Sequence, residues 1–142
     1  MVGRTMGYDI VGDIHGHAHE MKALLAGLGY GRHERGYRHP ERKVLFVGDF
    51  VDRGPAIGEV FEIVRSMVDA NDALAVMGNH EYNAIAFHTP KPGKQDAWFR
   101  HHSEKNLKQH YETLKQLSTS QHTEAVTHLC SRSAFRCSSK EL

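Results

Sequence analysis

Short apolar runs and longer amphipathic stretches alternate along the first half of the chain. The runs at 8–11, 43–47 and 73–77 each predict a buried strand. Residues 18–28 predict a helix between the first two strands, because four apolar residues recur at the spacing of one helical face: Met21, Leu24, Leu25 and Leu28. Pro55 suits the first position of a second helix, whose buried stripe is predicted at Ile57, Val60, Phe61, Val64, Met67 and Val68.

This strand–helix–strand–helix–strand order predicts a parallel α/β sheet. The spacing of the runs is close to the roughly 30 residues of a crossover unit. The middle strand, Lys-Val-Leu-Phe-Val, is of the continuous apolar kind found in sheets with both faces covered. Residues 30–42 are polar, contain Pro40 and are predicted to form a loop.

The pattern changes after Glu81. Residues 82–87 predict a short helix, 89–93 a loop, and 95–117 a polar helical segment with packing residues at Trp98, Leu107, Tyr111, Leu114 and Leu117. Another short helix is predicted at 121–129, whereas 131–142 has no period of either kind. We therefore expect a folded domain over 1–129 and a disordered or aberrant tail over 130–142.

Composition excludes several classes of protein. The 142 residues, 39% hydrophobic and 25% charged, suit one globular domain. A net charge of +1 argues against a broad nucleic-acid surface. No apolar run approaches the roughly 18 residues that span a bilayer, and no secretory signal follows Met1, so we expect no membrane partner and a cytoplasmic location. Cys130 and Cys137 match no zinc spacing, and most histidines from His88 onward are interpreted as surface groups.

Three glycine-led clusters carry the candidate chemistry. They span 12–16 (Gly-Asp-Ile-His-Gly), 48–55 (Gly-Asp-Phe-Val-Asp-Arg-Gly-Pro) and 78–81 (Gly-Asn-His-Glu), and each follows one predicted strand. Because ligand sites in parallel sheets lie beyond the carboxyl ends of the strands, the clusters are expected to meet at one edge. The sequence therefore predicts a site rich in oxygen and nitrogen donors.

Four of these residues are candidate metal ligands. Asp13 and His15, two positions apart on an extended segment, can reach one ion from the same side. Asp49 offers two oxygens, enough to bridge two ions about 3.5–4 Å apart. Asn79 adds an amide oxygen that hard cations accept. Each cluster taken alone has a simpler interpretation as a helix cap or a surface group.

Three further residues are candidates for handling the substrate. Arg53 presents a planar fork of donors suited to phosphate oxygens. His80 can protonate a leaving oxygen, and Asp52 can orient a neighbouring imidazole. The alternatives are an ion pair at a helix start for Asp52 and Arg53, and an Asn helix cap with Glu81 in the first turn.

Together the clusters resemble the calcineurin-like metallophosphoesterase family, whose motifs run G-D-x-H-G, G-D-x-x-D-R-G and G-N-H-E. The resemblance spans residues 8–81 and is nearest to the bacterial members grouped with serine/threonine protein phosphatases and symmetrical diadenosine tetraphosphatases. It implies a β-α-β-α-β half of an αββα sandwich, which in this chain is followed by the mainly helical C-terminal segment that the residue pattern predicts. It also implies two divalent ions, Mn, Fe or Zn, which activate a water for attack at phosphorus.

The resemblance also assigns roles. Asp13 and His15 correspond to ligands of the first ion, Asp49 to the bridging ligand and Asn79 to a ligand of the second ion. His80 corresponds to the general acid, with Asp52 as its orienting partner and Arg53 as a phosphate clamp. These assignments are carried over position by position from the three motifs.

The chain departs from the family after Glu81. The family adds a lone metal-binding His and a G-H-x-H motif in a second half of the fold, and the only match to that motif, at 16–19, overlaps the first cluster. The second ion would keep only Asp49 and Asn79. We therefore expect the N-terminal half of a longer phosphoesterase, cut short or read out of frame near residue 129, with an exposed sheet face open to self-association. A substitute ligand among the late histidines, such as His88 or His101, is the rival explanation.

The sequence predicts a metal-dependent phosphoesterase that hydrolyses phosphomonoester or phosphoanhydride bonds. The alternative is a catalytically impaired fragment, acting at most as a weak metal- or phosphate-binding module. A dinucleotide-binding domain is disfavoured because no G-x-G-x-x-G follows the first strand. A phosphoprotein, a dinucleoside polyphosphate and an RNA end all remain open as substrates.

Overall fold

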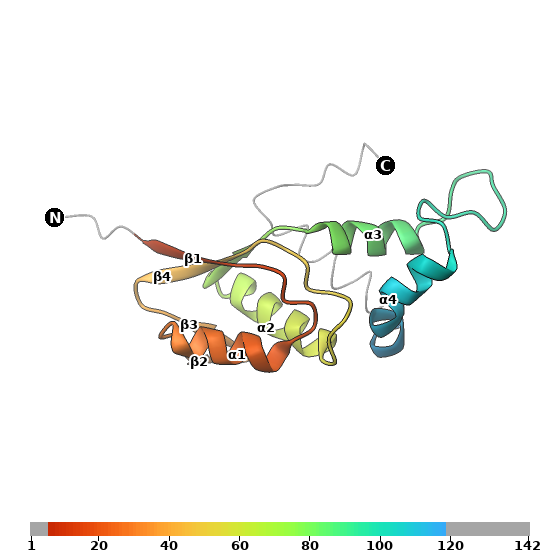
Figure 1. Ribbon diagram of the computed structural model, residues 1–142. Coiled ribbons are helices and arrows are strands. Elements are labelled where there is room, and N and C mark those ends of the chain that lie inside the picture. Colours follow the sequence, from red (N-terminus) through yellow and green to blue (C-terminus); the bar gives the residue numbers. More distant parts are fainter. Residues whose placement is uncertain (1–5, 119–142) are drawn as a thin grey trace.

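The computed structural model describes residues 6–118 (Figure 1). Its elements are β1 (Gly7–Val11), α1 (Ala18–Gly27), β2 (Gly31–His33), β3 (Gly36–Arg38), β4 (Arg42–Phe46), α2 (Ile57–Asp69), β5 (Ala73–Ala75), α3 (Asn79–His88) and α4 (Glu104–Gln116). The predicted helix at 121–129, the tail at 130–142 and both cysteines lie outside the described residues. No helix in the described part is long and apolar enough to cross a membrane; the cytoplasmic location stays a prediction.

The main sheet confirms the predicted α/β class. Its strands lie in the order β1-β4-β5, and both pairings are parallel. Val11 lies opposite Phe46, which in turn lies opposite Ala75, so the three strands end at one edge. The clusters that follow the strands therefore start from neighbouring points, as the strand pattern predicted.

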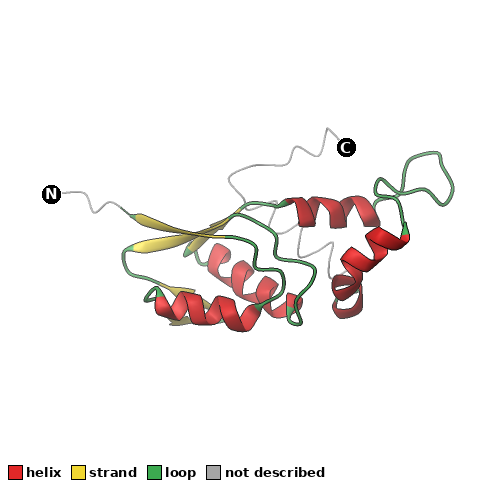
Figure 2. Ribbon diagram, viewed as in Figure 1, coloured by secondary structure: helices red, strands yellow, loops and turns green. Residues whose placement is uncertain are grey.

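Helices α1 and α2 cover one face of this sheet (Figures 1 and 2). The predicted stripe of α2 is buried in full, and Val44 and Phe46 of β4 are completely buried beneath it. Helix α1 packs through Ala18, Met21 and Leu25. Leu24, predicted on the same face, is 47% exposed, because it lies at the rim of the stripe.

The opposite face of the sheet is open among the described residues. Tyr8 is 54% exposed, Ile10 69% and Val47 44%. Coverage of both faces, predicted from the apolar run at 43–47, is therefore not met within residues 6–118. Self-association through this face stays a prediction.

Residues 30–42 are not the predicted loop. Strands β2 and β3 form an antiparallel hairpin there. Tyr30 and Tyr37 are buried, and Gly36 lies so close to Met67 that a Cβ at this position would overlap the methionine side chain. Strands of three residues are too short to show alternation in a sequence, and the anchoring aromatic residues stand among charged ones.

The chain beyond Gly78 also differs from prediction. Helix α3 begins at Asn79, inside the third cluster, rather than at Tyr82. The segment predicted as helical at 95–117 is helical only from Glu104. Within α4, Leu107 is 42% and Tyr111 58% exposed, although both were predicted to pack. The buried side chains of α4 are His110 and Thr113, both polar, while Leu117 at its C-cap is partly buried and packs against the core as predicted.

Candidate functional site

The loops after β1 and β4 are joined by main-chain hydrogen bonds. His15 N donates to Asp49 O, Gly16 N to Phe50 O and Gly54 N to His15 O, each at 2.8 Å. Gly54 cannot be replaced without moving this contact, because a Cβ there would overlap His15 O. Gly48, with φ +89°, is equally constrained, since its Cβ would overlap the amide nitrogen of Gly78. The glycines of the clusters thus allow the three loops to touch.

Predicted site residues adopt left-handed backbone conformations. Eight non-glycine residues of the described chain have positive φ, and five of them belong to the predicted set: Asp13 (52°), His15 (44°), Asp49 (58°), Asp52 (68°) and Arg53 (66°). Such conformations are uncommon outside glycine and persist only where surrounding contacts enforce them. Their concentration in two loops is typical of a functional site.

Glu81 holds the second and third clusters together. Its carboxylate is 1% exposed and accepts four main-chain hydrogen bonds. Oε2 accepts from Asp49 N at 2.8 Å and Gly78 N at 2.9 Å, while Oε1 accepts from Phe50 N at 2.7 Å and Val51 N at 3.1 Å. A helix cap by Glu81 explains the hydrogen bond from Gly78 N but not the three from the loop after β4. No local sequence pattern signals those three bonds.

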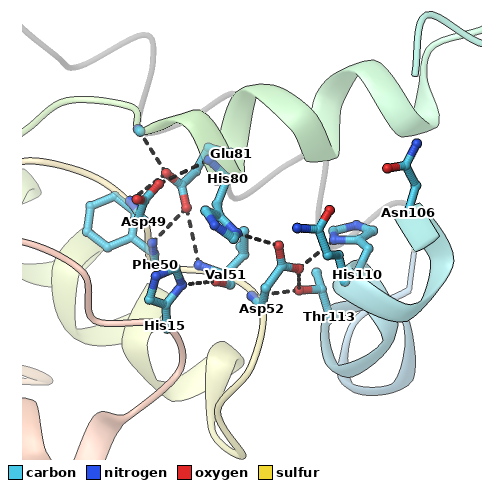
Figure 3. A network of polar contacts seen from close by, with 12 residues as sticks. His15, Asp49, Phe50, Val51, Asp52, His80, Glu81, Asn106, His110 and Thr113 are labelled. Carbon is cyan, nitrogen blue, oxygen red and sulfur yellow. Dashed lines mark hydrogen bonds and ion pairs between the residues drawn. The ribbon is translucent and has the colours of Figure 1, made fainter. Parts of the chain in front are cut away.

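One group of donors could hold a metal ion. Ligand atoms of His15, Asp49 and His80 lie within 4.8 Å of one another (Figure 3). The His15 Nδ1–H donates to Val51 O at 2.8 Å, which leaves Nε2 for an ion, as is usual for a metal-binding imidazole. Asp13 Oδ1 lies 3.7 Å from that Nε2. Of the donors predicted for the first ion, the structure brings together His15 and Asp49 and adds His80, whereas Asp13 lies beside His15 but outside this group of the described residues.

The remaining candidates are more exposed. Asn79 is an exposed first residue of α3, and no contact described for residues 6–118 joins its side chain to the donor group. Arg53 is exposed and lines a cavity of about 990 Å³ together with His80 and residues of α4. His88 and His101 do not belong to the donor group of the described chain, so the geometry gives no support to a substitute ligand there.

Asp52 lies between two imidazoles. It is 4% exposed, and its Oδ2 accepts from His80 Nδ1 at 2.7 Å. Oδ1 accepts from His110 Nδ1 and from the Thr113 hydroxyl, both at 2.6 Å. Burial alone would raise the pKa of Asp52, but the hydrogen bonds from His110, Thr113 and His80 outweigh it and lower the pKa to about 2. The carboxylate is therefore ionised over the whole neutral range.

The Asp52–His80 contact was predicted, whereas its continuation to α4 was not. His110 is 5% and Thr113 1% exposed. His110 stands among the late histidines that the sequence assigned to the surface, so that assignment is wrong for this residue. Only the helical spacing of a His and a Thr hinted at a shared face, and such spacing is common on exposed helices.

Comparison with known proteins supports the interpretation of the motifs. A family model described as calcineurin-like phosphoesterase matches residues 6–131. The asymmetrical bis(5'-nucleosyl)-tetraphosphatase PrpE of Anoxybacillus flavithermus is 49% identical over 74 residues, which cover 51% of this chain and 30% of that protein. The PrpE of Halalkalibacterium halodurans is 45% identical over 76 residues, covering 53% and 31%. These relatives are named asymmetrical, whereas the sequence had suggested symmetrical enzymes.

Solved structures share the fold. One assigned as a diadenosine tetraphosphatase matches with a TM-score of 0.53 at 22% identity, over 91% of this chain and 44% of that one. A serine/threonine phosphatase from Saccharomyces cerevisiae matches with a TM-score of 0.54 at 20% identity, over 89% and 33%. The chain thus aligns with about a third of each curated relative and less than half of each solved structure. The match to the family model across most of its length shows that the chain belongs to the calcineurin-like phosphoesterase family.

Proposed function

We propose that the chain is a metal-dependent phosphoesterase, or the part of one that binds the first ion and the phosphate. The observation that carries this proposal is the convergence of His15 and Asp49, from the loops after β1 and β4, with His80 from the first turn of α3. The activity proposed is hydrolysis of a phosphomonoester or phosphoanhydride bond.

The residues of the first position fit a divalent transition metal such as Mn, Fe or Zn. Imidazole and carboxylate donors suit these ions, and the Nδ1 bond of His15 to Val51 O already selects the tautomer that offers Nε2. Asp13 and Asp49 supply the negative charge. A bound ion would supply a water of lowered pKa as nucleophile and neutralise phosphoryl charge.

The second position does not fit an ion within the described residues. Among the described residues it would rest on Asp49 and Asn79 alone, and Asn79 is exposed. Two protein ligands hold a transition metal weakly, and we derive no step through this position. Its weakness favours the alternative of an impaired module if turnover is absent.

The other residues would handle the phosphate. Arg53, which lines the same cavity as His80, would pair with phosphoryl oxygens through its guanidinium. His80, held at Nδ1 by Asp52, would present Nε2 to the leaving oxygen and donate a proton there. Asp52 stays ionised and keeps the imidazole in that orientation.

We further propose a dinucleoside tetraphosphate as the substrate class. The support is the tetraphosphatase name of the PrpE relatives, which align with about half of this chain. Unequal cleavage of a four-phosphate bridge would release a nucleoside triphosphate and a monophosphate, whereas symmetrical cleavage would release two diphosphates. Phosphoproteins and RNA ends are the competing substrates.

Metal titration combined with turnover tests the proposal. Mn²⁺ binding to the full chain is measured by calorimetry, and hydrolysis is followed with para-nitrophenyl phosphate and diadenosine tetraphosphate. Asp49→Asn should weaken Mn²⁺ binding by more than the roughly 10–100-fold of an outer-sphere change. Asp96→Asn is the matched control, because Asp96 is exposed and shares the left-handed φ of Asp49 (52° against 58°).

Equal Mn²⁺ affinity in Asp49→Asn and the control would refute the metal assignment. His80→Ala should retain the ion and lower the rate by about 10²–10⁴-fold, as loss of a general acid does. Loss of the ion instead would make His80 a ligand. One weakly held ion with no turnover would establish the impaired module.

A further inference from the structure

Helix α4 holds the loop after β4 at two points. Thr113 Oγ1 accepts from the Asp52 amide at 2.9 Å. One turn further on, Gln116 accepts from Ile57 N at 2.8 Å and donates to Gly54 O at 2.8 Å. The segment from Asp52 to Ile57 is therefore fixed by polar side chains from an element that lies far along the chain. Figure 3 shows α4 approaching the carboxylate from the side opposite His80.

The two carboxylate oxygens of Asp52 have separate partners. Oδ1 receives the His110 and Thr113 donors, and Oδ2 receives His80. An ionised carboxylate only accepts hydrogen bonds, so both imidazoles must carry a hydrogen on Nδ1. His80 is thereby restricted to the tautomer with Nε2 directed away from Asp52. Two short bonds on Oδ1 leave the carboxylate little freedom to rotate.

We propose that His110, supported by Thr113, is a positioning residue: it fixes the rotation of the Asp52 carboxylate, and through it the tautomer and orientation of His80. The kinetic consequence of this inference rests on the proposed function, whereas its effect on the tautomer of His80 can be measured without any turnover. None of the three motifs contains His110, and α4 is linked to the site through the carboxylate of Asp52.

Substitutions at His110 separate positioning from simple packing. His110→Leu fills similar volume and removes the donor. His110→Asn places an amide N–H near the former Nδ1 and restores it. His101→Leu is the matched control, since His101 is an exposed loop histidine whose ring makes no described contact with the site. Should His110→Leu fail to fold, Thr113→Val removes the second donor to Oδ1, with Thr113→Ser as its conservative partner.

The first readout is the tautomer of His80 in the full chain labelled with ¹⁵N-histidine. Long-range ¹H–¹⁵N spectra are recorded about two units above the ordinary histidine pKa of about 6.5, where neutral imidazoles reveal their protonated nitrogen. His80→Gln assigns the signal. Wild type, His101→Leu and His110→Asn should show His80 protonated at Nδ1, whereas folded His110→Leu should show a mixture of tautomers.

The second readout is kinetic. His110→Leu should lower kcat about tenfold with KM changed less than about twofold, because phosphate contacts are untouched, and His110→Asn should recover most of the loss. A folded His110→Leu variant that keeps the Nδ1 tautomer of His80 overturns the proposal. If wild type itself shows no turnover, the proposed function fails while the tautomer result still decides the role of His110.

Discussion

The sheet with α1 and α2 differs from the α3–α4 segment in what holds it together. Helix α2 buries seven apolar side chains against the strands, whereas α4 buries a histidine and a threonine. Area removed from water stabilises the first region without regard to direction, while the second buries fewer apolar side chains, among them Ala84 and Phe87, and adds a few directed hydrogen bonds. The first region is thus a tolerant scaffold, and the second is a specific attachment at the site.

The largest test of this difference compares two leucines. Leu25 on α1 is fully buried, so Leu25→Ala should lower the free energy of unfolding by roughly 2–5 kcal/mol through lost burial and a cavity. Leu107 on α4 is 42% exposed, and Leu107→Ala should cost about 0.5 kcal/mol or less. Urea unfolding of both variants measures the contrast. Similar losses in the two would mean that α4 packs through apolar contacts after all.

Glu81 tests whether one buried carboxylate can matter nearly as much as a core leucine. Glu81→Gln keeps the volume but turns an NH₂ group toward main-chain donors, and should cost about 2–3 kcal/mol. Glu59→Gln is the control, because that exposed carboxylate pairs with Lys22 at 2.7 Å on the surface and its loss should cost under about 1 kcal/mol. Thermal and urea unfolding compare the two variants. Equal losses in the free energy of unfolding would show that Glu81 does not hold the second and third clusters together.

Acid should loosen the α4 region before the core. A pKa of about 2 in the fold, against the ordinary 3.8, means that ionised Asp52 stabilises the folded chain above about pH 4. That contribution, about 2 kcal/mol, is lost as pH falls through 4 toward 2. Unfolding measured across this range should show wild type and Asp52→Asn converging at low pH. A difference that stays constant would assign the effect to packing.

The smallest expected effect concerns Gln116, which satisfies the first amide of α2 from another helix. Gln116→Ala should cost about 1 kcal/mol, the usual loss of a helix N-terminal hydrogen bond, and should speed amide exchange at Ile57. Gln109→Ala is the matched control, since Gln109 pairs with Arg100 on the surface of α4. Unchanged exchange at Ile57 would show that α2 does not need this contact.

The sequence predicted the scaffold well because burial leaves a periodic trace. All six residues predicted for the stripe of α2 are buried, and only Ile63, the seventh buried apolar residue of this helix, was missed. The three strands followed from their apolar runs, and the loops that follow them from the parallel order. The hairpin at 31–38 was missed because its strands span three residues each.

The attachment of α4 left no such trace. His110 and Asp52 are 58 residues apart, and a hydrogen bond between polar side chains imposes no period on either segment. Leu107 and Tyr111 have the spacing of a buried helical face, and for this reason they were wrongly predicted to pack. Directed contacts over long sequence separation require coordinates, whereas the short motif around Asp52 and His80 was enough to predict their pairing.

The left-handed backbone at the site restricts which sequences can occupy it. Asp13, Asp49 and Asp52 each combine a proposed chemical role with φ between 52° and 68°. Asn and Gly tolerate that geometry, but a β-branched residue does not, and a longer Glu would displace the oxygen it is meant to supply. Random mutagenesis should therefore find that very few residue types are tolerated at these three positions. New substrate specificity would then have to arise from substitutions at neighbouring residues.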